Sequence, residues 1–122
     1  SMRARCIKVK KELTQTLYRL REEQQSICGI GCPGRCSTLL NYCHITPDLL
    51  PYIAEQSTCL KLGMFLPGTH TPIVDEARIF EEQPDYALVL SWHYAEPIMK
   101  NLRAKGLKSK FILPFPDVKI VT

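Results

Sequence analysis

Residues 26–42 have the sequence SICGIGCPGRCSTLLNY. The small apolar run 26–30 predicts a short buried strand, and the run Cys36 to Cys43 predicts a helix, with a glycine-rich turn between them. A turn of this kind directs backbone N–H groups and the positive end of a helix dipole toward one point. We therefore expect a phosphate or other anion site at this turn.

Three glycines in this stretch, Gly29, Gly31 and Gly34, have the spacing G-x-G-x-x-G of dinucleotide sites. Gly29 and Gly31 lack the side chains that would keep a ligand away from the backbone, and Ser37 or Thr38 can cap the following amides. The spacing alone is a weak signal. The alternative is a tight strand-to-helix turn that binds nothing.

Length and composition indicate one domain, since 122 residues is a common domain size. The net charge of +4 is modest, and the basic residues form no stripe with aromatic ones, so nucleic acid is not indicated. Neither a membrane span nor a signal peptide is visible, so we expect a cytoplasmic protein. Residues 1–2 resemble an expression scar, ahead of an N-terminal helix over 3–25 and a single Rossmann-like domain over 26–122.

The cysteines are expected to be free thiols that hold no metal. There are six, namely Cys6, Cys28, Cys32, Cys36, Cys43 and Cys59. The aliphatic content is sufficient for an ordinary core without disulfides. Three of the six follow one another at four-residue intervals, but the C-x-x-C pairs typical of zinc sites are absent.

The first segment, Arg3 to Gln25, has the apolar period of a helix, with Ile7, Leu13, Leu17 and Leu20 on one face. Its charged residues predict a solvated opposite face. The alternative is a linker helix that joins this domain to another.

A second strand is predicted over Leu49 to Ala54. It is followed by Glu55, which lies 21 residues after Gly34, where dinucleotide sites place an acid for ribose hydroxyls. Residues 61–73 then form a loop shaped by glycine and proline. We expect this loop to fold over the carboxyl ends of the strands and to bring Thr69 and His70 to the glycine turn, although His70 alone is more often structural.

The remaining elements alternate in type. We predict strands over 73–74, 86–91, 110–113 and 118–121, and helices over 75–82 and 95–104. Trp92 and His93 stand at the end of the 86–91 strand, where α/β folds gather ligands. The order predicts an α/β fold, a Rossmann-like three-layer sandwich with a mainly parallel sheet, preceded by a long N-terminal helix.

The chain resembles the C-terminal domain of SAM-dependent sugar C-methyltransferases over about residues 23–121. The resemblance is carried, in this order, by GIGCPGRCSTLLNYC from Gly29, Lys61-x-Gly63, PGTHTPI from Pro67, Pro84-Asp-Tyr86, LSWHYA from Leu90 and FILPFP from Phe111. It implies a module that binds a nucleotide-linked sugar, while SAM belongs to a separate domain of the full enzyme. No cofactor is expected on this chain itself.

The motifs and the resemblance together give a set of expected ligand-binding residues. They are Gly29, Gly31, Gly34, Arg35, Ser37, Thr38, Asn41, Glu55, Lys61, Gly68, Thr69, His70 and Trp92. Several positions depart from the family pattern. Cys32, Arg35 and Cys36 replace alanine, lysine and glycine, Glu55 replaces aspartate, and His93 replaces asparagine.

Three readings of the whole chain remain open. It is a piece of a longer C-methyltransferase whose SAM-binding domain is its partner, or a module that works alone in assembly or protein interaction. A small enzyme that uses His70 or His93 is the third, but it lacks a second positioned catalytic group. No catalytic residue is assigned.

Overall fold

The computed structural model describes residues 1–31 and 36–122. Its first element is α1 (Met2–Glu22), which begins after Ser1, whose side chain accepts a hydrogen bond from the amide of Ala4 at 3.2 Å. The predicted long N-terminal helix is confirmed, and it ends before the predicted Gln25 because Gln24 has a φ of 61°.

The buried face of α1 differs from the predicted one in a single residue. The side chains of Val9, Leu13, Leu17 and Leu20 are all at most 1% exposed, whereas Ile7 is 54% exposed. The buried residues are spaced by four, four and three, which keeps them on one stripe of a helix. The predicted placement of Ile7 on the buried face was therefore wrong, since Val9 takes that position.

In the described part of the chain the sheet has six strands, in the order β3-β2-β1-β4-β5-β6. Their bounds are β1 (Ile27–Ile30), β2 (Ile53–Glu55), β3 (Ile73–Asp75), β4 (Tyr86–Val89), β5 (Lys110–Leu113) and β6 (Lys119–Val121). Every pairing is parallel except that of β5 with β6. This is the strand order of a Rossmann fold, with its last strand reversed.

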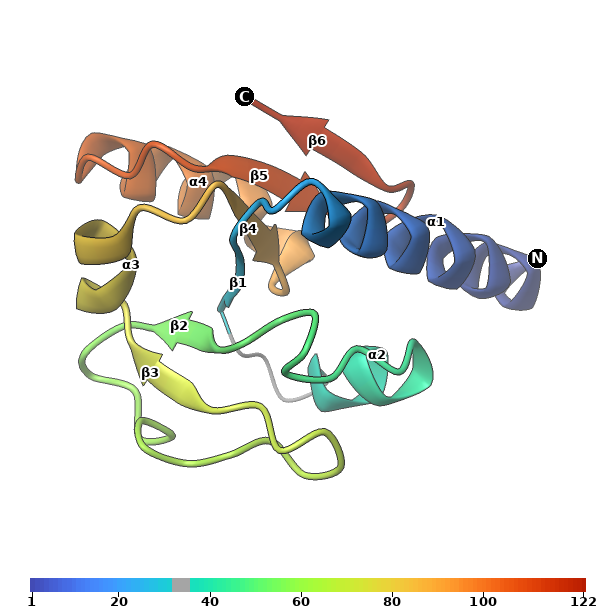
Figure 1. Cartoon of the computed structure of the whole chain (residues 1–122), viewed down its shortest axis with the longest axis horizontal. Helices are drawn as coiled ribbons and strands as arrows, with labels where there is room; N and C mark the ends of the chain where they lie inside the picture. Colours follow the sequence, from blue (N-terminus) through green and yellow to red (C-terminus); the bar gives the residue numbers. More distant parts are fainter. Residues whose placement is uncertain (32–35) are drawn as a thin grey trace.

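Helices cover both faces of the sheet, as the predicted α/β fold requires (Figure 1). One face packs against α1 and α2 (Cys36–Tyr42) in a core that includes Leu17, Leu40 and Leu88. The other face packs against α3 (Ala77–Glu82) and α4 (Ala95–Ala104), where the core includes Ile79, Val89 and Leu102. A short 3-10 turn, η1 (Trp92–Tyr94), joins β4 to α4.

Strand β2 is shorter than predicted, because its expected first half forms a turn. The amides of Leu49 and Leu50 both donate to the carbonyl of Thr46, at 2.9 and 3.0 Å. Pro51 follows and has no amide hydrogen to give to a sheet. The strand therefore begins only at Ile53, although the carbonyl of Tyr52 already accepts from the amide of Gly29.

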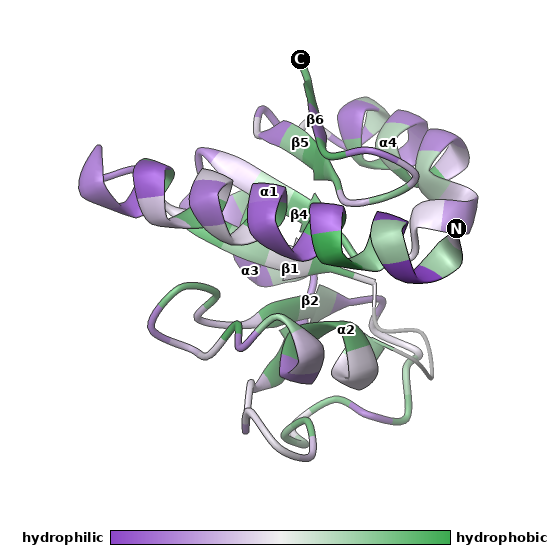
Figure 2. Ribbon diagram, turned by 90° about the vertical axis from the view of Figure 1, so that its right-hand side faces the viewer, coloured by the Kyte–Doolittle hydropathy of each residue, from purple (hydrophilic) through white to green (hydrophobic). Residues whose placement is uncertain are grey.

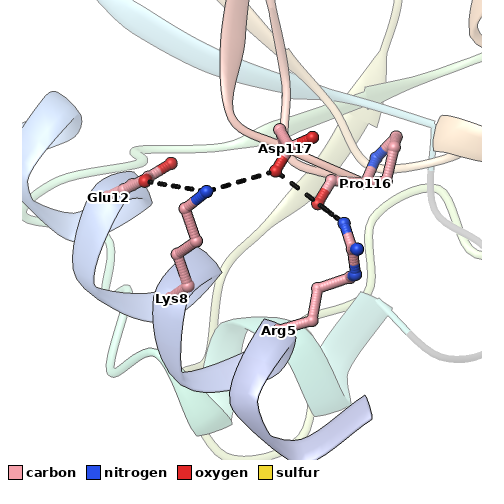
Figure 3. Close-up of polar contacts among 5 residues, drawn as sticks. All are labelled: Arg5, Lys8, Glu12, Pro116 and Asp117. Carbon is pink, nitrogen blue, oxygen red and sulfur yellow. Dashed lines mark hydrogen bonds and ion pairs between the residues drawn. The ribbon is translucent and has the colours of Figure 1, made fainter. Parts of the chain in front are cut away.

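Polar contacts attach the N-terminal half of α1 to the loop between β5 and β6 (Figure 3). Arg5 Nη1 donates to the carbonyl of Pro116 at 3.2 Å and lies 3.8 Å from Asp117 Oδ1. Lys8 Nζ lies 3.5 Å from the same carboxylate and 3.8 Å from that of Glu12.

No helix in the described part of the chain is long and apolar enough to span a membrane.

Candidate functional site

A pocket of about 340 Å³ opens at the carboxyl ends of the parallel strands. Strand β1 lies between β2 and β4, so the chain leaves β1 toward one side of the sheet and later returns on the other. Ligands of open α/β sheets bind at this reversal point. The pocket is lined by Ile30, Gly31, Ala54, Glu55, Gln56, Glu76, Ser91, Tyr94, Ile98, Asn101 and Leu102.

Gly31 follows β1 directly and has a φ of 76°, which favours glycine. A Cβ atom built there would lie 2.6 Å from Ser91 Oγ, so the missing side chain lets the ends of β1 and β4 approach each other. Its amide donates to the carbonyl of Ala54 at 3.1 Å and is therefore engaged in the sheet. Gly31 shapes the pocket through its backbone conformation.

Gly29 has a packing role in the structure. Its amide is bonded to Tyr52, and a Cβ atom there would lie 3.1 to 3.3 Å from the side chains of Ile53, Leu90 and Leu50. The absence of a side chain thus makes room for the core on the α1 and α2 face. Ligand contact by Gly29 stays a prediction, as it does for Gly34 and Arg35, which lie outside the described residues.

Acidic groups stand at the ends of β2 and β3. Glu55 is partly exposed, and its Oε2 accepts from the thiol of Cys59 at 3.7 Å. Glu76 is paired with Lys105 Nζ at 2.9 Å. Among the ion pairs of the described residues none involves Glu55, so its carboxylate has acceptor capacity left for hydroxyl groups at the pocket.

Asp75, the last residue of β3, accepts a hydrogen bond from the amide of Ala77 at 2.9 Å. This bond, with a second from Ser57, lowers the pKa of the Asp75 carboxyl. The carboxylate thus holds the turn into α3 and does not line the pocket.

The loop with Thr69 and His70 does not fold over the carboxyl ends of the strands, contrary to the prediction. It leaves β2 at the carboxyl end but must enter β3, which is parallel to β2, at the amino end. Thr69 and His70 immediately precede β3. They therefore lie near the amino ends of the parallel strands, at the opposite end of the sheet from the pocket. Any ligand contact by these two residues therefore requires a site other than the pocket at Gly31.

Asn41 and Gly68 hold this loop to α2. Asn41 Nδ2 donates to the carbonyl of Pro67 at 3.2 Å, and a Cβ atom at Gly68 would lie 2.1 Å from Asn41 Oδ1. Thr69 Oγ1 lies 2.8 Å from Thr71 Oγ1, while the side chain of His70 is exposed. The Pro-Gly-Thr-His sequence thus fits close packing against α2.

The other predicted residues are spread over the fold. Ser37 and Thr38 lie in the first turn of α2, and Lys61 lies in the β2–β3 loop, where its amide donates to Cys59 Sγ at 3.4 Å. Trp92 packs on Phe115 with 4.9 Å between ring centroids. Trp92 and Thr38 line a separate hollow, on the α1 side of the sheet.

Sequence reasoning missed several residues that line the pocket, among them Ser91, Tyr94, Glu76 and Asn101. Ser91 is the last residue of a predicted strand, and Tyr94 and Glu76 closely follow the ends of predicted strands, a signal that could have identified them. Asn101 comes from the middle of α4, and its position depends on how this helix lies on the sheet.

Four of the described cysteines, Cys6, Cys28, Cys43 and Cys59, are free thiols. Burial raises the pKa of Cys28 to about 12 and that of Cys43 to about 11. Lys10 partly offsets the rise at Cys43. Both thiols are therefore protonated and inert near neutral pH, and no cluster of metal-ligating side chains is present among the described residues.

Strand order, helices on both faces and a pocket at the reversal point define a Rossmann-like α/β domain. A model of the C-methyltransferase C-terminal domain family matches residues 1–116, and the chain belongs to this family. C-methyltransferase NovU from Streptomyces niveus is 28% identical to it over 117 residues. These residues are 94% of this chain but 27% of NovU, so the chain spans about a quarter of that relative's length.

Proposed function

We propose that this domain binds the nucleotide-linked sugar substrate of a sugar C-methyltransferase, with Glu55 accepting hydrogen bonds from hydroxyl groups of the ligand. The observation that carries the proposal is the pocket at the carboxyl ends of β1 to β4, which Glu55 and Gly31 both line. Membership of the family supports the class of ligand. In this view the methyl donor SAM binds to another domain, and this domain supplies no catalytic residue.

The chemistry of the pocket fits the hydroxylated part of such a ligand. Among the described residues of its lining there is no lysine or arginine, and Glu55 and Glu76 are both present. Carboxylates repel phosphate and accept hydrogen bonds from hydroxyls. We therefore assign the diphosphate of the ligand to the glycine turn, where Gly34 and Arg35 would bind it, and this assignment stays a prediction. The cytoplasmic location also stays a prediction.

Calorimetric titration with uridine and thymidine diphosphate sugars tests the proposal. Glu55→Gln keeps the size of the side chain and removes its charge, so we expect about tenfold weaker binding, as for a lost charge-assisted hydrogen bond. Glu81→Gln is the matched control, because Glu81 is exposed on α3 outside the pocket lining. Gly31→Val is a poor probe, since strain at this position would alter the fold itself.

SAM is the comparison ligand that tests selectivity for nucleotide sugars, because SAM also carries a ribose whose hydroxyls Glu55 could bind. We expect nucleotide sugars to raise the melting temperature and SAM to leave it unchanged. The proposal is wrong if wild type binds no nucleotide sugar at millimolar concentration. Equal stabilisation by SAM would contradict the division of roles between the domains.

A further inference from the structure

A second hollow, of about 650 Å³, lies on the α1 and α2 face of the fold. It is bounded by the N-terminal half of α1, by α2 and by the aromatic pair Trp92 and Phe115. We call this hollow the α1 groove. Among the described residues, none lines both this groove and the pocket at Gly31.

The α1 groove is predominantly apolar, and part of its lining is open to solvent. Ile7 is 54% exposed and Tyr42 is 43% exposed, while Val9 and Leu39 beneath them are buried. Figure 2 shows green, apolar turns near the N-terminal end of α1, whereas its other end is mainly purple and hydrophilic. Exposed apolar side chains gathered in a hollow are typical of a protein interaction site.

The helix beside this groove is strongly basic. From Met2 to Lys11 it carries five cations and no carboxylate, the cations being Arg3, Arg5, Lys8, Lys10 and Lys11. Arg5 and Lys8 are partly neutralised by Asp117 (Figure 3). Arg3 lines the groove and makes no ion pair with any described carboxylate.

We propose that the α1 groove binds an acidic amphipathic segment of a partner protein. Its apolar side chains would enter the hollow beside Ile7 and Trp92, and its carboxylates would face Arg3 and the other cations of α1. Charge complementarity selects this occupant. A second copy of the chain placed helix to helix would oppose like charges, and a lipid surface would not fill a concave hollow.

Peptide titration tests this proposal. The probe is a helical peptide of about 16 residues with a leucine face and glutamates on its flanks. One comparison peptide has lysine for glutamate, and another has serine for leucine. Trp92 is the single tryptophan and lies in the groove, so its fluorescence reports binding. We expect only the leucine–glutamate peptide to change this signal, and with weaker affinity at higher salt.

Ile7→Glu and Arg3→Glu should each weaken binding at least about tenfold. Tyr18→Glu is the matched control, because Tyr18 lies on the same helix, is 57% exposed and does not line the groove. It should bind as wild type does, and melting temperatures should show that all three variants fold.

Four results would each overturn the proposal. They are equal binding of the acidic and basic peptides, unchanged binding by Ile7→Glu, self-association that Ile7→Glu abolishes, and binding of phosphatidylglycerol vesicles but of no peptide. Peptide binding that a nucleoside diphosphate competes away would instead make the groove part of a ligand site.

Discussion

Gly31 and Gly29 show how differently two glycines of one motif are used. Gly31 has a positive φ, and a Cβ atom there would clash with Ser91, so both backbone conformation and space exclude a side chain. Gly29 lies within the sheet and leaves room for Ile53 and Leu50. The spacing of a motif does not distinguish a residue that shapes a pocket from one that relieves crowding in the core.

Gly31→Ala should lower the free energy of unfolding by about 2–4 kcal/mol, because it adds a clash with Ser91 to the strain of a positive φ. Gly63→Ala is the matched control, with a φ of 84° and nothing within 4 Å, and should lose about 1–2 kcal/mol. Urea titration measures both. Equal losses would show that the contact with Ser91 does not matter.

The cysteines should differ in reactivity when the protein is folded. Cys28 and Cys43 are buried and their pKa values are raised, so they should resist iodoacetamide at pH 8. Cys6 and Cys59 are partly exposed and should react first. Mass spectrometry of digested protein follows each thiol. Rapid labelling of Cys28 in the native state would contradict its burial.

At the scale of elements, α1 is held to the rest of the fold by two kinds of contact. Leu13, Leu17 and Leu20 are fully buried in the core. The ion pairs of Arg5 and Lys8 with Asp117 are about half exposed. Exposed pairs contribute little because water and salt screen them, so the apolar face of α1 dominates its attachment.

Leu17→Ala should therefore lower the free energy of unfolding by about 2–5 kcal/mol. Asp117→Ala should lower it by less than about 1 kcal/mol, and this loss should shrink further at high salt. Chemical denaturation of both variants at low and high ionic strength makes the comparison. A larger loss for Asp117→Ala would mean that polar contacts hold the helix.

At the scale of the whole molecule, both cores contain a thiol that favours its neutral form. Cys28 lies in the core beneath α3 and α4, and Cys43 in the core beneath α1 and α2. Burial also raises the pKa of Tyr52, which donates to Glu82 Oε1 at 3.1 Å. Because these groups ionise less readily in the folded protein, the stability of the complete fold depends on pH in the alkaline range.

Stability should be retained up to about pH 9 and then fall as pH rises toward 11 or 12. The unfolded thiols ionise near pH 9, whereas folded Cys28 and Cys43 keep their protons up to about 12 and 11. At pH 10 each thiol should account for a loss of about 1 kcal/mol. Denaturation between pH 8 and 11 under reducing conditions measures this decline. The stability of Cys28→Ala should decline less steeply with pH than that of wild type. An identical slope would exclude ionisation of the Cys28 thiol as a cause.

The sequence by itself determined the order of elements, the mainly parallel sheet and the family. Apolar periods and the punctuation by glycine and proline are local properties, so they are visible without a structure. The bounds of α4 and β5 follow directly from such patterns. The position of Glu55 at the end of β2 was also predictable, because it depends only on where a strand stops.

Only the tertiary structure decided which of these residues meet. His70 lies near the amino ends of the strands because β2 and β3 are parallel. Ile7 is exposed because Val9 occupies the core side of α1. Asn101 reaches the pocket because of the way α4 packs on the sheet, which brings Ile98 and Leu102 into the same lining. Such contacts depend on strand direction and helix rotation, which packing of the whole molecule sets and no local pattern encodes.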